Sequence, residues 1–333
     1  MTKIRDFLGP YRLARLIRMG SSCQVWEGIN TETGERYALK VLREDFRNNK
    51  QEVGFLRSEF QIAKSLNHPN VIKMYDLDLS GNAPYLVLEL FSELNMKQAL
   101  RRGPESLAYM LGKVLEESIE GLYHMHSHGY VHCDVKPDNF LVSRDGHVKL
   151  IDFTISHKVK TGLAKFFSGK AKQIQGTRSY MSPEQIRGLP LDARTDIYSF
   201  GCVMFEMVTG KLPYTGDSPN DLLNKHISAP LPSPLVYNDN VTPEFAAVMR
   251  LAMAKRPQDR PDTMWELLKI VHATKIFKKQ PRIPETSIFD DFPTSGRIMN
   301  QEQAAPEPES KEPKEPKESK ESEGTEGTEK PKE

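Results

Sequence analysis

The chain has 333 residues, of which 38% are hydrophobic and 27% charged, and its formal net charge is +1. This length allows one large domain or two ordinary ones, each with a core of its own. The near-zero net charge gives no reason to expect nucleic acid or an acidic membrane surface as a partner, and no apolar run approaches the roughly 18–20 residues of a membrane span.

The three cysteines favour a reducing compartment. Cys23, Cys133 and Cys202 are an odd, scattered set without CxxC spacing, which argues against a disulfide framework or a zinc site. Charged residues interrupt the first twenty positions, so this stretch lacks a signal-peptide core. We therefore expect a cytoplasmic protein.

The first ninety residues are predicted to be rich in strands. Apolar residues alternate or cluster in five short segments, and TETG at 31–34 has the composition of a hairpin turn. These strand segments are 11–17, 24–30, 35–42, 71–79 and 84–90. Between them, residues 52–66 (EVGFLRSEFQIAKSL) carry apolar side chains at helical spacing.

Beyond Leu94 the pattern becomes helical. Long apolar-faced segments are predicted to form helices, and 195–210 is apolar nearly all round, which indicates a buried helix. The four predicted helices cover 106–129, 195–210, 242–254 and 263–277. The predicted fold class is α+β, with a small β-rich lobe at about 11–90 and a larger α-helical lobe at about 94–275.

The C-terminal segment 280–333 is expected to be a disordered tail. Residues 301–333 hold eleven Glu and six Lys, a net of −5, which leaves +6 of the total +1 to the rest of the chain. Glu, Lys, Pro and Ser dominate this stretch, so it cannot bury enough apolar surface to offset chain entropy. A solubilising tail is favoured over a tether, a phosphoacceptor or a docking segment.

Five ordered motifs carry the chemistry. Taken alone, each motif has an ordinary structural interpretation. Lys40 could be a solvated lysine on a strand, and Asp134, Lys136 and Asn139 could form a polar turn. The motifs are YALKVL (37–42), VHCDVKPDNF (131–140), VKLIDF (148–153), GTRSYMSPEQ (176–185) and DIYSFGCVMFEMVTGKLPY (196–214). In this order the chain resembles a eukaryotic-type serine/threonine protein kinase over about residues 11–275, and MSPEQ is most similar to the bacterial branch.

The resemblance implies a site for ATP and Mg²⁺. Lys40 would hold the α- and β-phosphates and pair with Glu59, while Asn139 and Asp152 would supply oxygen ligands to Mg²⁺. The residues implied to surround the rest of the nucleotide are Ile17, Gly20, Val25, Ala38, Leu88 (the gatekeeper), Glu89, Phe91 and Leu141.

The resemblance also implies catalytic and supporting residues. Asp134 would accept the proton of the attacking hydroxyl, and Lys136 would offset charge on the γ-phosphate. Asp196 would brace the backbone of the catalytic loop, and Glu184 would pair with Arg260.

Three features of the sequence depart from the family pattern. Only Gly20 of three expected glycines remains in IRMGSSCQV (17–25), because Arg18 and Cys23 occupy the outer positions. Thr154 stands where Gly is expected after Asp152 and Phe153. Because Gly permits the backbone to flip at this point, Thr154 predicts a stiffer transition to an inactive state. Cys133 replaces the arginine that commonly binds a phosphorylated activation segment, so a charge-based phospho-switch loses its main receptor.

The segment between Asp152 and Glu184 is basic. A solvated loop is favoured over a docking site for an acidic or phosphorylated protein. Its lysines and arginine are Lys158, Lys160, Lys165, Lys170, Lys172 and Arg178, and its candidate phosphosites are Thr161, Ser168, Thr177 and Ser179. Thr177 is expected to keep a structural hydroxyl near Asp134 and Lys136.

We therefore expect an ATP-dependent protein kinase that phosphorylates Ser or Thr hydroxyls of proteins and, through self-association, its own chain. The alternative is a pseudokinase, a nucleotide-binding scaffold without turnover, which the depleted glycine turn and Thr154 favour. A small-molecule kinase is disfavoured by SPEQ (182–185) and the DIYSFG helix, which by resemblance belong to lobes that bind peptides.

Overall fold

The computed structural model describes residues 7–81, 83–159 and 176–284. All of them belong to one compact unit that lies within residues 1–295. Most of the predicted tail therefore lies outside the described residues. Across the described ranges, no helix has both the length and the apolar character of a membrane span.

The N-terminal part is a six-stranded antiparallel sheet in the order β1-β2-β3-β4-β6-β5. Its strands are β1 (Phe7–Leu8), β2 (Tyr11–Met19), β3 (Cys23–Asn30), β4 (Arg36–Leu42), β5 (Met74–Asp78) and β6 (Tyr85–Glu89). A single helix, α1 (Lys50–Lys64), packs against β5. It starts two residues before the predicted boundary because the Asn49 side chain caps it by accepting hydrogen bonds from the Gln51 and Glu52 N–H groups.

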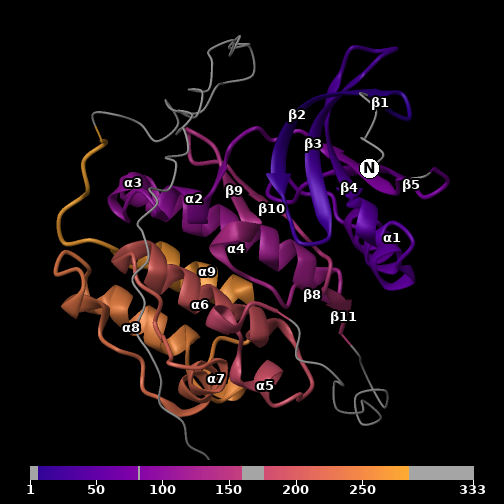
Figure 1. Ribbon diagram of the computed structural model, residues 1–333. Coiled ribbons are helices and arrows are strands. Elements are labelled where there is room, and N and C mark those ends of the chain that lie inside the picture. The colour runs from indigo at the N-terminus through magenta and orange to yellow at the C-terminus, as the bar shows by residue number, and fades with distance from the viewer. Residues whose placement is uncertain (1–6, 82, 160–175, 285–333) are drawn as a thin grey trace, which may run out of the picture. The chain divides into compact units, whose positions relative to one another are not determined.

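The C-terminal part is mostly helical, as Figure 1 shows below the sheet. Its helices are α2 (Met96–Leu100), α3 (Glu105–Ala108), α4 (Leu111–Ser127), α5 (Pro183–Ile186), α6 (Ala193–Thr209), α7 (Pro219–Ser228), α8 (Pro243–Ala252) and α9 (Met264–Ala273). The single helix predicted over 106–129 is wrong, since the backbone leaves helical dihedrals at Met110 (φ −118°, ψ 13°) and divides it into α3 and α4. The buried helix predicted over 195–210 is confirmed as α6, which is buried from Thr195 to Thr209 and ends at Gly210 in the left-handed conformation (φ 69°).

Short strands and turns form the junction between the two lobes. The three-stranded sheet β10-β9-β7 comprises β7 (Leu94–Asn95), β9 (Phe140–Val142) and β10 (Val148–Leu150), and β8 (Tyr130–Val131) pairs with β11 (His157–Lys158). The described residues also form the 3₁₀ turns η1 (Glu44–Phe46), η2 (Pro137–Asn139), η4 (Arg178–Tyr180), η5 (Pro234–Val236) and η6 (Pro257–Asp259).

One hydrophobic core runs through both lobes. It includes Leu56 of α1 and Leu86 of β6, continues through Phe140 and Phe153 at the junction, and reaches Phe200 of α6. The predicted α+β architecture of a small sheet lobe and a larger helical lobe is thus confirmed. The order of the helical lobe extends slightly past the predicted end, because Lys278 N–H donates to the Asn240 carbonyl (2.7 Å) and Gln280 Nε2 to the Tyr109 carbonyl (3.1 Å).

Candidate active site

Lys40 is the centre of an ion cluster that joins the two lobes. It lies on β4, and its ammonium donates to both carboxylate oxygens of Glu59 on α1 (2.9 and 2.7 Å). The same ammonium contacts Asp152 Oδ1 at 3.1 Å, although the two residues are 112 positions apart. Burial by itself would lower the pKa of Lys40, but the Asp152 and Glu59 carboxylates outweigh it and hold this pKa above its ordinary value.

Asp152 follows β10 and adopts a left-handed backbone conformation, with φ of 68°. Its carboxylate accepts hydrogen bonds from Lys40 and from the Thr154 hydroxyl, the latter at 2.5 Å. Burial opposes ionisation here, but these two donors hold the pKa of Asp152 well below its usual range. Asp152 is therefore an anion at neutral pH.

Asp134 is held by a second set of donors. The Thr177 N–H and hydroxyl both donate to its Oδ1 at 2.9 Å, and Lys136 donates to its Oδ2 at 2.5 Å. Lys136 also donates to the Thr177 hydroxyl at 2.8 Å. The expected position of the Thr177 hydroxyl beside Asp134 and Lys136 is thus present, and it fixes the activation segment to the catalytic loop at this point.

Asn139, in η2, links the two acidic groups. Its Nδ2 donates to the Asp134 carbonyl (2.8 Å), and its own carbonyl accepts from the Ile151 N–H, directly before Asp152 (3.0 Å). Its side-chain oxygen Oδ1 is buried and has no hydrogen-bond partner among the described residues. Asn139 Oδ1 is thus a buried oxygen to which no described residue donates, on a residue that is hydrogen-bonded to the neighbour of the ionised Asp152. An oxygen of this kind is a suitable ligand for a hard divalent cation.

The catalytic loop is fixed from below by Asp196 of α6. This fully buried carboxylate accepts hydrogen bonds from the His132 N–H (2.7 Å) and the Cys133 N–H (2.9 Å), and it contacts His126 Nε2 (2.8 Å). The expected brace is confirmed. Sequence reasoning missed His126, whose only signal was its position on the buried face of the preceding helix.

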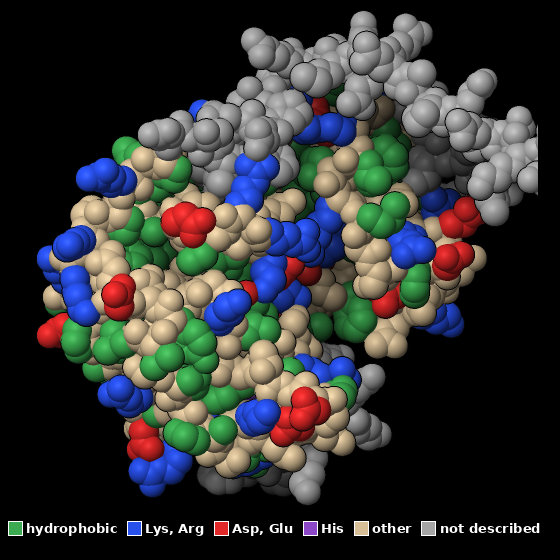
Figure 2. Space-filling model, turned by 60° about the vertical axis from the view of Figure 1, so that its left-hand side comes forward, with side chains coloured by type: hydrophobic (Ala, Val, Ile, Leu, Met, Phe, Trp, Pro, Cys, Tyr) green, Lys and Arg blue, Asp and Glu red, His purple; other side chains and the backbone are tan. Residues whose placement is uncertain are grey.

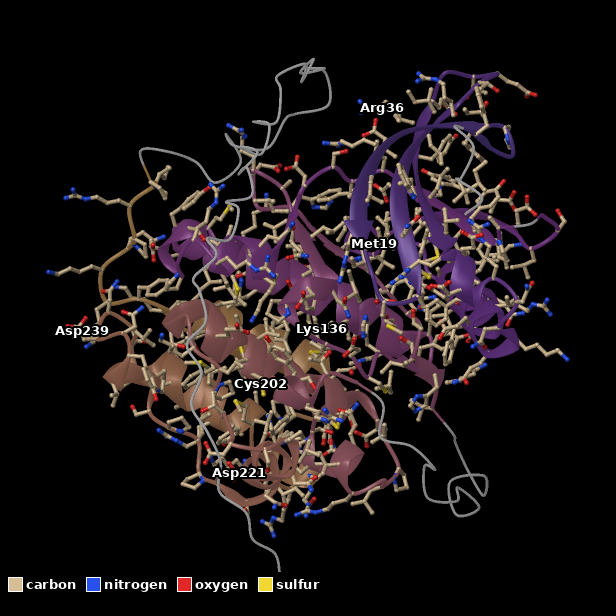
Figure 3. The ribbon with its side chains drawn as sticks, in the orientation of Figure 1. Met19, Arg36, Lys136, Cys202, Asp221 and Asp239 are labelled. Atoms are coloured by element: carbon tan, nitrogen blue, oxygen red, sulfur yellow. The ribbon has the colours of Figure 1, made fainter. Side chains whose placement is uncertain are left out.

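The glycine-poor turn between β2 and β3 is closed by its own hydrogen bond, from Gly20 N–H to the Cys23 carbonyl (2.8 Å). Arg43 supports it from outside: its N–H donates to the Ser22 carbonyl (2.8 Å) and its guanidinium to the Ser21 carbonyl (2.9 Å). Arg43 was not predicted as part of the site. In Figure 3, Met19 at the end of β2 and Lys136 both lie near the junction of the lobes.

The residues expected around the adenine are distributed over both lobes. Ala38 on β4 is buried and pairs with Leu88 on β6, whereas Ile17 on β2 is exposed. Val25 on β3 and Phe91 are partly buried against the core, and Leu141 on β9 is half-buried. The Glu89 side chain forms an ion pair with Lys149 at 2.9 Å, a use of this carboxylate that was not predicted.

Lys and Arg side chains gather at the hollow between the two lobes in Figure 2. Of the basic activation segment, Lys158 and Arg178 are described, whereas Lys160, Lys165, Lys170, Lys172 and the candidate phosphosites Thr161 and Ser168 lie outside the described residues.

Comparisons with known proteins agree with this geometry. A family model described as "Protein kinase domain" matches residues 11–273. The chain is 32% identical to a probable serine/threonine-protein kinase of Streptomyces coelicolor over 264 residues, 78% of this chain and 39% of the relative. It is 33% identical to the serine/threonine-protein kinase PknA of Mycobacterium tuberculosis over 284 residues, 84% and 64% of the two chains. It is 32% identical to the serine/threonine-protein kinase PrkC of Bacillus subtilis over 256 residues, which are 77% of this chain and 39% of the relative. The chain thus spans between about two fifths and two thirds of the length of these relatives.

Proposed function

The chain belongs to the protein kinase family, and from this premise we propose that it transfers the γ-phosphoryl group of ATP to Ser and Thr hydroxyls of proteins. The observation that carries the proposal is the contact of the Lys40 ammonium with both Glu59 and Asp152. Phosphoryl transfer needs a cation on the phosphates and a metal-binding carboxylate in fixed relation to each other. This contact supplies both, from residues far apart in the sequence.

Protein kinases use ATP and a divalent metal, and we propose Mg²⁺ here, held by Asp152 and Asn139. The depressed pKa of Asp152 and the Asn139 Oδ1, for which the described residues offer no hydrogen-bond partner, support this assignment. When bound, the ion would neutralise charge on the phosphate oxygens. Lys40, kept protonated by Asp152 and Glu59, would orient the α- and β-phosphates.

Asp134 is the proposed base. The acceptor hydroxyl oxygen would attack the γ-phosphorus, the bond between the γ-phosphorus and the bridging oxygen of ADP would break, and Asp134 would take the hydroxyl proton. The Thr177 donors fix the carboxylate, and Lys136, whose ammonium donates to Asp134 Oδ2 at 2.5 Å, would offset charge on the transferred group. The proposed adenine slot would be lined by Val25, Ala38, Leu141 and the segment from Glu89 to Phe91, and Ile17 and Gly20 belong to the turn that would cover the phosphates.

The scaffold alternative receives no support. The relatives are named as serine/threonine kinases, and the polar residues that transfer requires make contact with one another here. The physiological partner is proposed to be a protein with an accessible Ser or Thr, and autophosphorylation would bring two copies of the chain together. We place the chain in the cytoplasm, in keeping with its three unpaired cysteines.

The test is incorporation of labelled phosphate from ATP and Mg²⁺, comparing wild type with Asp134→Asn. We expect wild type to label itself on Ser or Thr and the variant to lose at least about 100-fold in rate, since a positioned base contributes roughly 10²–10⁴-fold. Asp239→Asn is the matched control, because Asp239 is exposed and lies at the far edge of the helical lobe from Lys136 in Figure 3. Equal labelling of wild type and Asp134→Asn, or no labelling by a wild type that binds ATP, would contradict the proposal.

A further inference from the structure

Thr154 places a hydroxyl inside the ion cluster where the family pattern has glycine. Its Oγ1 lies 2.5 Å from Asp152 Oδ1, 3.3 Å from the Lys40 ammonium and 3.4 Å from Glu59 Oε2. A hydroxyl has one hydrogen to donate, and the shortest contact to a carboxylate takes it. Thr154 therefore donates to Asp152 and accepts from Lys40, and the longer approach to Glu59 is secondary.

This contact fixes one oxygen of the Asp152 carboxylate. Oδ1 accepts hydrogen bonds from both Thr154 and Lys40, and neither of these donors reaches Oδ2. Two donors on one oxygen determine the rotation of the carboxylate about its Cβ–Cγ bond. With glycine at position 154, only the Lys40 ammonium would fix this rotation, and that ammonium also donates to Glu59.

The backbone at this point also needs support. Asp152 has φ of 68°, a conformation that non-glycine residues seldom adopt without help from their surroundings. The hydrogen bond from residue 154 back to the side chain of residue 152 closes a small ring across Phe153, which is itself fully buried. Side chain and backbone of Asp152 are thus held by one local contact.

We propose that Thr154 is a positioning residue that orients Asp152 for metal binding: its hydroxyl occupies Oδ1, so that Oδ2 stays presented to the cation together with Asn139 Oδ1. The proposal rests on the proposed function, because it takes Asp152 and Asn139 to be the metal ligands. Partners that orient a ligand commonly change metal affinity by about 10–100-fold when they are removed.

The experiment measures Mn²⁺ binding by electron paramagnetic resonance, with a non-hydrolysable ATP analogue present, so that no catalysis is required. The variants are Thr154→Val, which keeps the shape but removes the hydroxyl, Thr154→Ser, which keeps the hydroxyl, and Thr154→Gly, which is the family residue. We expect Val and Gly to weaken Mn²⁺ binding by about 10-fold or more and Ser to stay within about 2-fold of wild type. Affinity for the analogue without metal should be unchanged in all three, because Lys40 and Glu59 remain paired.

Two results would overturn the proposal: Thr154→Gly that binds Mn²⁺ as tightly as wild type, or Thr154→Ser that loses as much affinity as Thr154→Gly. If Thr154→Val fails to fold, the Ser and Gly pair decides, since neither adds bulk. The outcome is separate from that of the proposed function. A wild type without kinase activity that still binds Mn²⁺ in a hydroxyl-dependent way would refute the activity and leave the role of Thr154 standing.

Discussion

Cys133, at the position of the missing arginine, is held by its backbone rather than by its side chain. Its φ is 67°, its N–H donates to Asp196 (2.9 Å), and its carbonyl accepts from Gln185 Nε2 (2.8 Å). Gly176 packs against the same carbonyl, and a Cβ there would lie 3.1 Å from it. The surroundings thus impose a strained conformation from both sides, whatever side chain residue 133 carries.

The Cys133 side chain itself has a minor role. It is 6% exposed, and burial raises the pKa of its thiol well above the ordinary value, so it stays protonated and unreactive. Its Sγ lies 3.6 Å from Nδ1 of His157, an exposed residue of β11. The buried thiol thus contacts an exposed residue, His157.

We accordingly predict that Cys133→Arg folds and retains kinase activity, within about 10-fold of wild type, and gains a dependence on activation-segment phosphate. The new guanidinium would supply the cation that a phosphorylated segment binds. Rates would be measured before and after phosphatase treatment, with Cys133→Ser as the control that adds no charge. A folded but inactive Cys133→Arg protein would contradict this account.

At the scale of elements, a buried ion pair fixes α5, a helix of only four residues. Arg260 donates to both oxygens of Glu184 (2.6 and 3.0 Å), and the two side chains are almost fully buried. The remaining donors of Arg260 reach the carbonyls of Ala254, Arg194 and Lys255. The predicted pairing of Glu184 with Arg260 is confirmed, and it connects α5, α6 and the segment around η6.

We predict that Glu184→Ala lowers the free energy of unfolding by about 3–5 kcal/mol, because it leaves the Arg260 charge buried without its partner. Urea unfolding followed by circular dichroism would measure this. Asp259→Ala is the control, since it breaks the exposed pair with Arg256 and should leave the midpoint nearly unchanged. Equal losses in both variants would show that burial is not the deciding factor.

At the scale of the whole molecule, several contacts among the described residues tie the lobes together, including two between distant segments. One is the ion cluster of Lys40 and Asp152. The other is the segment after α1, where the Ile72 N–H donates to the Leu150 carbonyl and the Leu150 N–H to the Asn70 carbonyl. Together with the continuous core, these contacts lead us to expect that the lobes unfold as one cooperative unit.

The pH dependence of that unfolding should reflect His226 on α7. It is fully buried among Tyr198, Tyr214 and Lys255, and its Nε2 has no partner in the described residues. Burial, and secondarily the Lys255 charge, lower the pKa of His226 to about 4. Below the unfolded pKa of about 6.5 the unfolded chain takes up a proton that the folded chain does not. The contribution of His226 to the free energy of unfolding is therefore fully present above about pH 6.5, and it is lost as the pH falls towards 4.

We predict that this residue accounts for up to about 3 kcal/mol of stability lost between about pH 6.5 and pH 4. Thermal or urea unfolding across this range would measure the slope. His226→Gln should flatten it even if the variant is less stable at pH 7. An unchanged slope would assign the acid sensitivity to other groups, and His272→Gln, at an exposed position of α9, is the matched control.

The sequence by itself predicted the order of the lobes and the buried helix α6, because both depend on local patterns: alternation in the strands and an all-round apolar α6. The polar residues of the site were expected from the resemblance of short motifs to a family, and their roles stay predictions. The prediction of one helix over 106–129 was wrong, because the local apolar pattern carries no signal for the non-helical backbone at Met110.

Only the tertiary structure decided how the residues act on one another. The hydrogen bond from the Lys40 ammonium to the Thr154 hydroxyl, the Arg43 support of the glycine-poor turn and the Gln185 bond to Cys133 join positions that no pattern connects. Their physical reason is shared: each is a directional hydrogen bond whose donor reaches its acceptor only after the core has brought distant segments within about 3 Å.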